Sequence, residues 1–194
     1  MDVTQAGIER LDEFASLFGR AFADDAMIRW PFHDHDVEER ARKMWLAGGR
    51  DMVGEGWIWE IAPAAGFAAW VQPGGGERYQ EIELRSRDEI DGLTEDGGAR
   101  FAGLWGWIAE NLPAEPHWYL DHIAVEAEHR GNGLGSALIR FGLEQARRDG
   151  TCAFLETSRE GNVGIYEHLG FRVVHADDVP GGGPSIWFMR WDPA

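Results

Sequence analysis

We expect an α/β fold for this chain of 194 residues. Three observations predict it. Apolar residues recur at helical spacing in several segments, short strand-like apolar runs lie between these segments, and one such run leads through a glycine-rich loop into a helix. A chain of this length buries roughly 70% of the surface that its unfolded form exposes, so it needs neither disulfides nor a metal ion to fold. We therefore expect a single domain over residues 1–194.

The first half of the chain is predicted to contain three helices and one β-hairpin. Asp36 with Glu39 resembles a capping box that opens the second helix, and Pro113 ends the third. The polar segment 77–98 shows no clear pattern, so no element is predicted there. The predicted elements are a helix over 4–23, a loop over 29–36, a helix from 36 to about 53, strands over 57–61 and 67–71 joined by a turn over 62–66, and a helix over 101–112.

The second half alternates more regularly between strands and helices. Gly170 ends a short helix, and a glycine-rich loop over 181–184 separates the last two strands. The predicted elements are a strand over 118–125, a helix over 133–148, a strand over 152–156, a helix over 162–169, and strands over 171–174 and 185–191.

The charge of the chain excludes several classes of partner. There are 34 acidic and 18 basic residues, and the net charge of −16 repels nucleic acids and anionic membranes while it attracts cations such as amines. Solubility alone also explains such acidity. There is no apolar run of membrane-spanning length and no signal-peptide pattern, and the single Cys152 excludes an internal disulfide. We expect a cytoplasmic protein in which Cys152 is a small buried apolar residue.

The segment from Val125 to Ser136 is the most informative. A strand enters a loop with three glycines that opens a helix, and backbone N–H groups at a helix N-terminus bind anions. The dinucleotide fingerprint fails because Ser136 stands at its third glycine, and the nucleotide-binding P-loop fails because no lysine is present. A tight turn that binds nothing remains the alternative.

The same segment resembles a known family. Arg130-Gly131-Asn132-Gly133-Leu134-Gly135 matches the R/Q-x-x-G-x-G/A signature of the GNAT superfamily of N-acetyltransferases, and residues 162–171 are similar to its N-x-x-x-x-Y-x-x-x-G-F element. Residues 116–120 and 155–158 further resemble the actinobacterial branch that includes puromycin N-acetyltransferase. The clear resemblance covers about the last eighty residues.

The resemblance implies a fold and a cofactor site. The fold is a twisted mixed central sheet flanked by helices, in which two parallel strands splay to form a V-shaped cleft for acetyl-CoA, used as cosubstrate without a metal. The cofactor-binding motifs lie in 117–175, and acceptor specificity lies in about 20–115. The residues expected to bind the cofactor are Ile123, Ala124, Val125, Arg130, Gly131, Asn132, Gly133, Leu134, Gly135, Ser136, Asn162 and Tyr166.

Three residues are candidates for proton transfer. Tyr166 stands where many family members place a general acid, and a phenol is able to protonate a departing thiolate. Strand alternation puts Tyr119, Asp121, Ile123 and Val125 on one face. The resemblance implies that this strand supplies inward-facing acid or base residues, so Asp121 is the first candidate for the base and Glu156, on the adjacent strand, the second. A core tyrosine, two structural carboxylates and a water chain are the alternatives.

The function predicted is acetyl transfer from acetyl-CoA to the primary amine of a small molecule by direct attack. A non-catalytic acyl-CoA sensor and a protein acetyltransferase, acting on a lysine or an N-terminus, are the alternatives, and a homodimer is left open. Trp30 and Trp107 are candidates for an aromatic acceptor site. The segment His33-Asp34-His35-Asp36 lacks a metal-ligand spacing and is expected to be a solvated loop.

Overall fold

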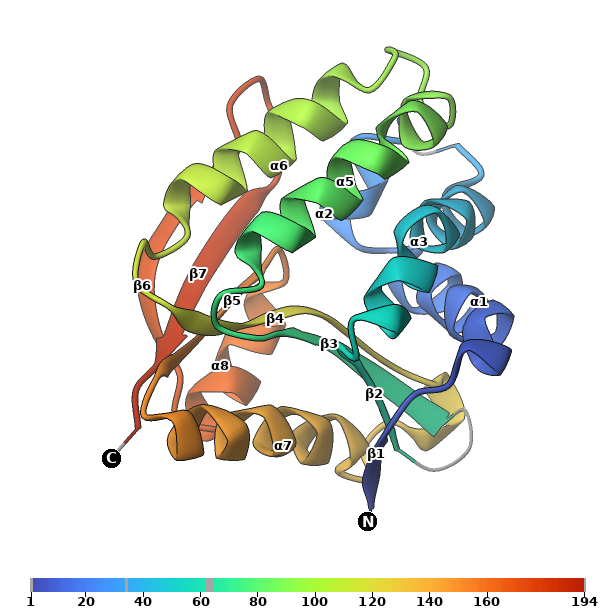
Figure 1. The fold of residues 1–194 in the computed structure, drawn as a ribbon. Coiled ribbons are helices and arrows are strands. Elements are labelled where there is room, and N and C mark those ends of the chain that lie inside the picture. Colours follow the sequence, from blue (N-terminus) through green and yellow to red (C-terminus); the bar gives the residue numbers. More distant parts are fainter. Residues whose placement is uncertain (1, 34, 62–64, 194) are drawn as a thin grey trace.

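A seven-stranded mixed sheet forms the centre of the molecule (Figure 1). The computed structural model describes residues 2–33, 35–61 and 65–193. The strands lie in the order β1-β2-β3-β4-β5-β7-β6. Their bounds are β1 (Val3–Gln5), β2 (Ile58–Ile61), β3 (Gly66–Val71), β4 (His117–Val125), β5 (Cys152–Thr157), β6 (Arg172–Asp178) and β7 (Ser185–Trp191).

The two central strands diverge along their length. β4 and β5 are parallel and pair only from His117↔Cys152 to Tyr119↔Phe154, although β4 continues to Val125 and β5 to Thr157. The other neighbouring pairs in the sheet are antiparallel. Beyond Tyr119, the edge of β4 that faces β5 therefore has no paired strand among the described residues. The expected α/β fold with splayed parallel strands is confirmed.

Helices cover both faces of this sheet. In Figure 1, α1, α3, α5 and α6 lie on one side, and α7 with α8 lies on the other. Apart from two short 3₁₀ turns, the helices are α1 (Leu11–Phe22), α2 (Ala26–Arg29), α3 (Val37–Gly54), α5 (Gly76–Asp91), α6 (Ala99–Asn111), α7 (Leu134–Asp149) and α8 (Glu160–His168).

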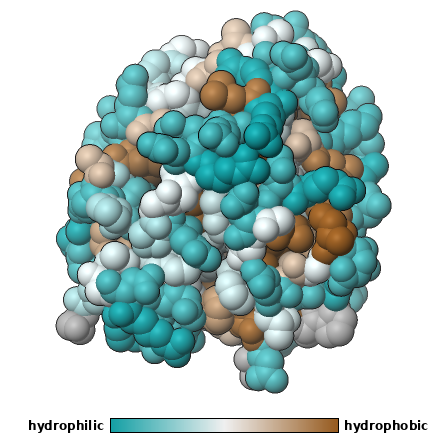
Figure 2. Space-filling model, viewed as in Figure 1, coloured by the Kyte–Doolittle hydropathy of each residue, from teal (hydrophilic) through white to brown (hydrophobic). Residues whose placement is uncertain are grey.

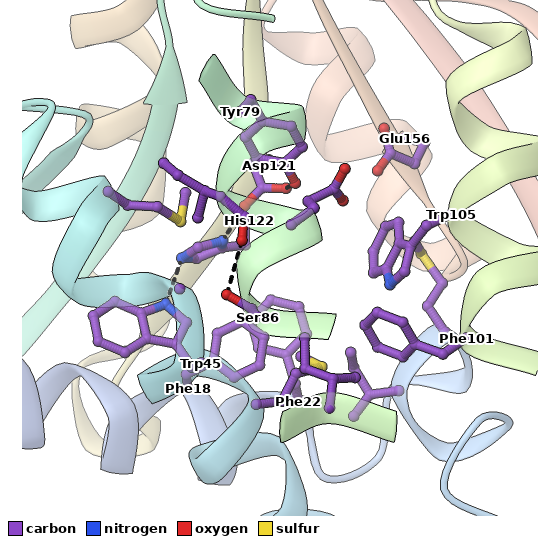
Figure 3. Close-up of a pocket in the computed structure, with 18 of the residues that line it drawn as sticks. Phe18, Phe22, Trp45, Tyr79, Ser86, Phe101, Trp105, Asp121, His122 and Glu156 are labelled. Carbon is purple, nitrogen blue, oxygen red and sulfur yellow. Dashed lines mark hydrogen bonds and ion pairs between the residues drawn. The ribbon is translucent and has the colours of Figure 1, made fainter. Parts of the chain in front are cut away.

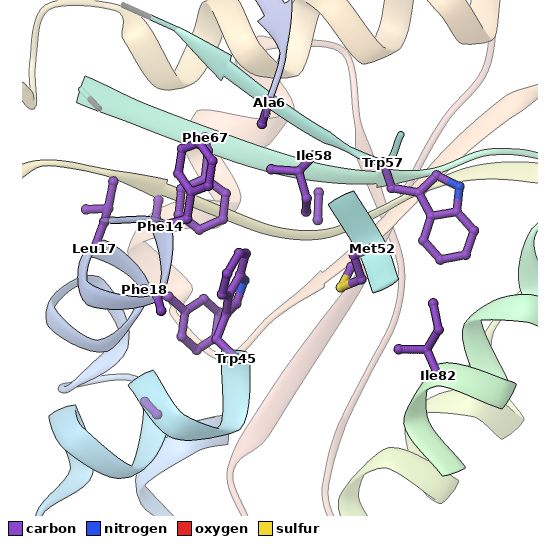
Figure 4. Packing of buried hydrophobic residues seen from close by; sticks show 14 of the residues in the cluster. Ala6, Phe14, Leu17, Phe18, Trp45, Met52, Trp57, Ile58, Phe67 and Ile82 are labelled. Carbon is purple, nitrogen blue, oxygen red and sulfur yellow. The ribbon is translucent and has the colours of Figure 1, made fainter. Parts of the chain in front are cut away.

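Each face of the sheet has its own apolar core. On the α1 and α3 side, Phe14 and Trp45 pack against Phe67 of β3 (Figure 4). On the other side α7 lies very close to β3, because Gly142 faces the fully buried ring of Trp70. A Cβ at position 142 would lie 2.1 Å from that ring. Dense packing of this kind fixes the sheet against both helical layers.

The structure confirms most of the predicted elements and corrects others. The hairpin of β2 and β3 is present, while residues 62–64 of its predicted turn lie outside the described residues. The expected first helix is shorter, because residues 3–5 form β1 and pair with β2. The unpatterned segment contains α5. Asp36 precedes α3 in a left-handed conformation and its side chain makes no capping hydrogen bond, so the capping-box prediction is wrong.

The molecular surface fits the acidic composition. The face shown in Figure 2 is mostly hydrophilic, and hydrophobic atoms appear on it in small separate patches. No helix among the described residues is long and apolar enough to cross a membrane. Within the same ranges, no group of three or more His, Cys, Asp or Glu side chains is arranged to hold a metal ion.

Candidate active site

A cavity of about 470 Å³ lies where β4 and β5 diverge. Side chains from α1, α3, α5 and α6 form its apolar walls, and residues of β4, β5 and α8 close the end toward the sheet. Figure 3 shows Asp121 and Glu156 at one side of this cavity, with Phe22, Phe101 and Trp105 around the rest. Carboxylates therefore face a cavity whose walls are largely aromatic and aliphatic.

A β-bulge in β4 sets the directions of the side chains at this end. Ala69 pairs with His122 and Trp70 pairs with Leu120, so Asp121 is one residue more than β3 can pair. Because of this bulge, the side chains after Asp121 alternate between the two faces of the sheet in the opposite phase to those before it. Tyr119 packs in the core on the α3 side, and Ile123 packs in the core on the α7 side. The prediction that Tyr119, Asp121, Ile123 and Val125 share one face is therefore wrong, although Asp121 does line the cavity.

Asp121 is held by a chain of hydrogen bonds that crosses from α3 to α5. The indole Nε1 of Trp45 donates to Nε2 of His122 at 2.9 Å, and an indole N–H can only donate. His122 is therefore the neutral tautomer with its proton on Nδ1, which donates to Oδ2 of Asp121 at 2.6 Å. The hydroxyl of Tyr79 donates to Oδ1 at 2.6 Å. Both carboxylate oxygens of Asp121 therefore already accept a hydrogen bond from the protein.

Glu156 on β5 has one oxygen occupied and one free. Tyr119 donates its hydroxyl to Oε1 at 2.7 Å, while the buried Oε2 has no hydrogen-bond partner among the described residues. Burial raises the pKa of Glu156 to about 8, and the negative charge of Asp121 adds to this effect. An unpaired, buried acceptor at a cavity wall is a place for a donor that the protein itself does not supply.

Glu83 on α5 is a third carboxyl at the cavity. Burial raises its pKa to about 7, with a further contribution from the charge of Asp121. It makes no hydrogen bond or ion pair with the residues that the structure describes. Its helix also carries Tyr79, one turn earlier, and further polar residues of α5 line the same cavity.

Tyr166 and Asn162 reach the same cavity from α8. Burial raises the pKa of Tyr166 above its usual value, as do the charges of Glu156 and Asp25, so the phenol keeps its proton. Asp25 itself accepts hydrogen bonds from Met27 N at 2.9 Å, from Ser158 Oγ at 2.9 Å and from Arg159 Nε at 3.2 Å. It ties α2 to the end of β5.

The glycine-rich loop leads from β4 into α7. Gly131 and Gly133 both have a φ of +80°, a conformation that residues with a side chain rarely adopt. A Cβ at either position would have no neighbouring atom within 4 Å. Gly133 precedes the first residue of α7, and no side chain caps that helix. The N–H groups of its first turn, from Leu134 to Ser136, therefore have neither helical partners nor a side-chain cap. Arg130 lies beside them and donates from Nε to Val125 O at 3.1 Å.

This arrangement of splayed strands, loop and helix has a counterpart in known proteins. A model of the acetyltransferase (GNAT) family matches residues 21–171. The chain belongs to this GNAT family. The narrower resemblance to the branch with puromycin N-acetyltransferase stays a prediction.

Two curated relatives of the chain are named as N-acetyltransferases. An uncharacterized N-acetyltransferase of Schizosaccharomyces pombe is 28% identical over 128 residues, which are 60% of this chain and 51% of that protein. Human N-acetyltransferase 8B is 32% identical over 114 residues, 49% of each chain. The chain thus spans about half the length of these curated relatives. A crystal structure from Corynebacterium glutamicum, described as histone acetyltransferase HPA2 and related acetyltransferase, shares the GNAT fold, with a TM-score of 0.66, 22% identity, and coverage of 99% of this chain and 96% of that one.

Within this GNAT domain the structure brings together some of the predicted residues and adds others. Asp121, Ile123, Glu156, Asn162 and Tyr166 line one cavity. Asn162 does not cap its helix, which begins at Glu160. Ala124 faces the core, and Val125 and the loop from Arg130 to Ser136 lie at the end of β4, outside the cavity lining. Cys152 is buried, and burial raises the pKa of its thiol.

The aromatic residues of the cavity differ from those predicted. Trp30 and Trp107 are partly buried against an apolar cluster of α6, β5 and β7 and do not line the cavity, whereas Trp45 and Trp105 do. Tyr79, Glu83 and His122 were also missed. The sequence does contain a signal for the helix that carries Tyr79 and Glu83. Tyr79, Ile82, Ser86 and Ile90 follow a helical spacing, but the polar Ser86 interrupts the apolar stripe.

Proposed function

We propose that this chain transfers the acetyl group of acetyl-CoA to the primary amine of a small molecule by direct attack. The observation that carries the proposal is the unpaired Oε2 of Glu156 in a largely apolar cavity of about 470 Å³. This volume lies within the range of about 300–1,000 Å³ that is usual for small-molecule sites. The size favours a small acceptor over a protein segment.

The residues around the splayed strands fit acetyl-CoA. The open N–H groups of residues 134–136, with the space at Gly131 and Gly133, suit a diphosphate. The backbone of β4 beyond Tyr119 lacks a neighbouring strand on one edge and suits a pantetheine arm. When bound there, acetyl-CoA supplies an acyl group activated as a thioester.

Glu156 is better placed than Asp121 to accept the proton of the amine. A free alkyl amine has a pKa near 10, so it enters as an ammonium ion. The oxygens of Asp121 already accept from Tyr79 and His122, whereas Oε2 of Glu156 is free. In its ionised form, which predominates above about pH 8, Glu156 is a stronger base than an ordinary glutamate.

Tyr166 supplies the other proton. The amine nitrogen forms a bond to the acetyl carbon, the carbon–sulfur bond breaks, and the sulfur leaves as a thiolate. Tyr166 lies in the cavity lining next to the diverging strands, and its phenol, kept neutral by burial, donates to the thiolate as it departs. The ammonium gives up two protons in all: Glu156 takes one before the attack, and the second leaves the nitrogen as the amide forms and restores the phenol of Tyr166, which has protonated the thiolate. The protons of the transfer are then balanced.

The test is a screen of small amines with acetyl-CoA that follows the release of free thiol. The wild-type protein should acetylate at least one amine, and Glu156→Gln and Tyr166→Phe should each lose about 10²–10⁴-fold in rate. Glu110→Gln, a change at an exposed glutamate of α6, is the matched control and should be as active as the wild type.

Two outcomes would favour the alternatives. If acetyl-CoA binds but no amine is acetylated, the sensor interpretation gains. If only lysines or N-termini of polypeptides are acetylated, the small-molecule acceptor is wrong.

A further inference from the structure

Four carboxyl groups line the cavity, and they differ in how many partners they have. Asp25 and Asp121 are satisfied by hydrogen bonds within the protein. Glu156 has one free oxygen, and Glu83 has no hydrogen bond or ion pair among the described residues. The cavity therefore offers acceptor atoms at two separate side chains, one on β5 and one on α5.

The cavity has little positive charge of its own to balance these groups. Arg87 and His122 are the basic side chains among the described residues that line it. Arg87 is paired with Asp91 of its own helix at 3.1 Å. His122 is neutral because its Nε2 accepts the hydrogen bond of Trp45. A ligand with one cationic nitrogen would balance Glu156 and leave Glu83 with the nearby charge of Arg87 but without a hydrogen bond or ion pair among the described residues.

Glu83 lies at the junction between this cavity and a second one. The second cavity, of about 380 Å³, also has Tyr79, Gln80, Trp105 and Ala109 in its lining. A molecule with its reactive nitrogen at Glu156 can therefore extend past Glu83, and the cavity walls it would cross are mainly apolar. The position fits a second polar group that is separated from the first by a hydrocarbon spacer.

From these contacts we infer that the acceptor is dibasic: an amine whose apolar spacer carries a second cationic nitrogen, which Glu83 binds. The inference rests on the proposed acetyl transfer. The nitrogen at Glu156 loses one proton to Glu156 and a second to the phenolate of Tyr166 as it takes the acetyl group, while the nitrogen at Glu83 keeps its charge, so the product is a monoacetylated diamine. Glu83 is then a residue for acceptor specificity and takes no part in the proton transfer.

The experiment compares matched amines with matched variants. Linear and aryl diamines of increasing length are each paired with the monoamine of the same length, and kcat/KM is measured with acetyl-CoA for the wild type, Glu83→Gln and Glu89→Gln. Glu89 is an exposed residue of the same helix and serves as the control. Calorimetric binding of the same amines is measured in parallel, because it does not depend on turnover.

We expect the wild type and Glu89→Gln to prefer the best diamine over its monoamine by about tenfold or more, the value of one charge-assisted hydrogen bond. Glu83→Gln should lose this preference, so that its kcat/KM for the diamine falls to about its kcat/KM for the monoamine. The two amines are compared within each variant, because the charge of Glu83 also affects the pKa of Glu156. The inference is overturned if the wild type shows no preference, or if Glu83→Gln keeps it. If no amine is acetylated, the proposed function fails, and calorimetry then tests the inference by itself. Diamine binding that depends on Glu83 supports the inference, and a lack of such binding refutes it.

Discussion

Replacement of Glu156 by glutamine tests the site through the stability of the protein as well as through its activity. Glutamine keeps the shape of the side chain and still accepts the hydrogen bond of Tyr119, but it cannot ionise. Burial raises the pKa of Glu156 from 4.5 to about 8, so the folded protein holds a proton on this group over a pH range in which the unfolded chain has released it.

The sign of the stability change follows from this difference. Between pH 4.5 and about 8 the folded state binds the additional proton, so the contribution of Glu156 to stability is complete below pH 4.5 and is lost as the pH rises through 8. At about 1.4 kcal/mol for each pH unit, ionisation of Glu156 costs the folded wild type at most about 5 kcal/mol. Because Asp121 and Glu83 share in this repulsion, we expect Glu156→Gln to gain about 2–5 kcal/mol over the wild type at high pH.

The assay is urea denaturation of both proteins at about pH 5 and about pH 9. The free energies of unfolding should be similar at the lower pH, and the variant should be the more stable protein at the higher pH, although its activity is reduced. Glu110→Gln should show no such change with pH, since that residue is exposed. A difference that is the same at both pH values, or a variant that is less stable at high pH, would refute the reasoning.

Three further predictions concern the acid, the loop and the packing of α7. Tyr166→Phe should lower kcat by about 10²–10⁴-fold while calorimetry finds an almost unchanged affinity for acetyl-CoA; full activity would exclude Tyr166 as the acid. Gly133→Asp places a negative charge in open space at the loop, so acetyl-CoA binding should be lost in a folded protein, and an unchanged affinity would contradict the loop assignment. Gly142→Ala should destabilise the protein by about 1–3 kcal/mol in urea, since a Cβ would lie 2.1 Å from the Trp70 ring, despite the better helix propensity of alanine; a rise in stability would falsify this packing argument.

The sequence predicts the C-terminal half of the fold well because its signals are strong and local. The apolar stripe of α7 and the short apolar runs of β5 and β7 each match one type of element. α5 was missed because only Ile82, Ser86 and Ile90 are buried along it, and one of these is polar. β1 was missed because it has three residues, which are too few to show a period, and the sheet alone makes it a strand.

Part of the site was predictable from motifs and from the two central strands, since Asp121 and Glu156 line the cavity as expected. Tyr166 and Asn162 lie in one motif, and both reach the cavity. Glu83 and Trp45 come from segments distant in sequence, and tertiary packing alone brings them to the residues of β4 and β5. No sequence pattern signals the bulge at Asp121, so regular alternation placed the side chains beyond it on the wrong face.

The bulge also affects how relatives of this chain are to be compared. β4 has one residue more than the partner strand needs, and this residue divides the strand into two parts with opposite phase. A relative that lacks the extra residue would keep the same side chains on the same sides of the sheet, provided that the alignment gap is placed at Asp121. Residues equivalent to Ile123 are therefore to be counted back from the glycine loop, and those equivalent to Tyr119 forward from the start of the strand. An alignment gap placed one position away would match a residue that faces the cavity with a residue that faces the other side of the sheet.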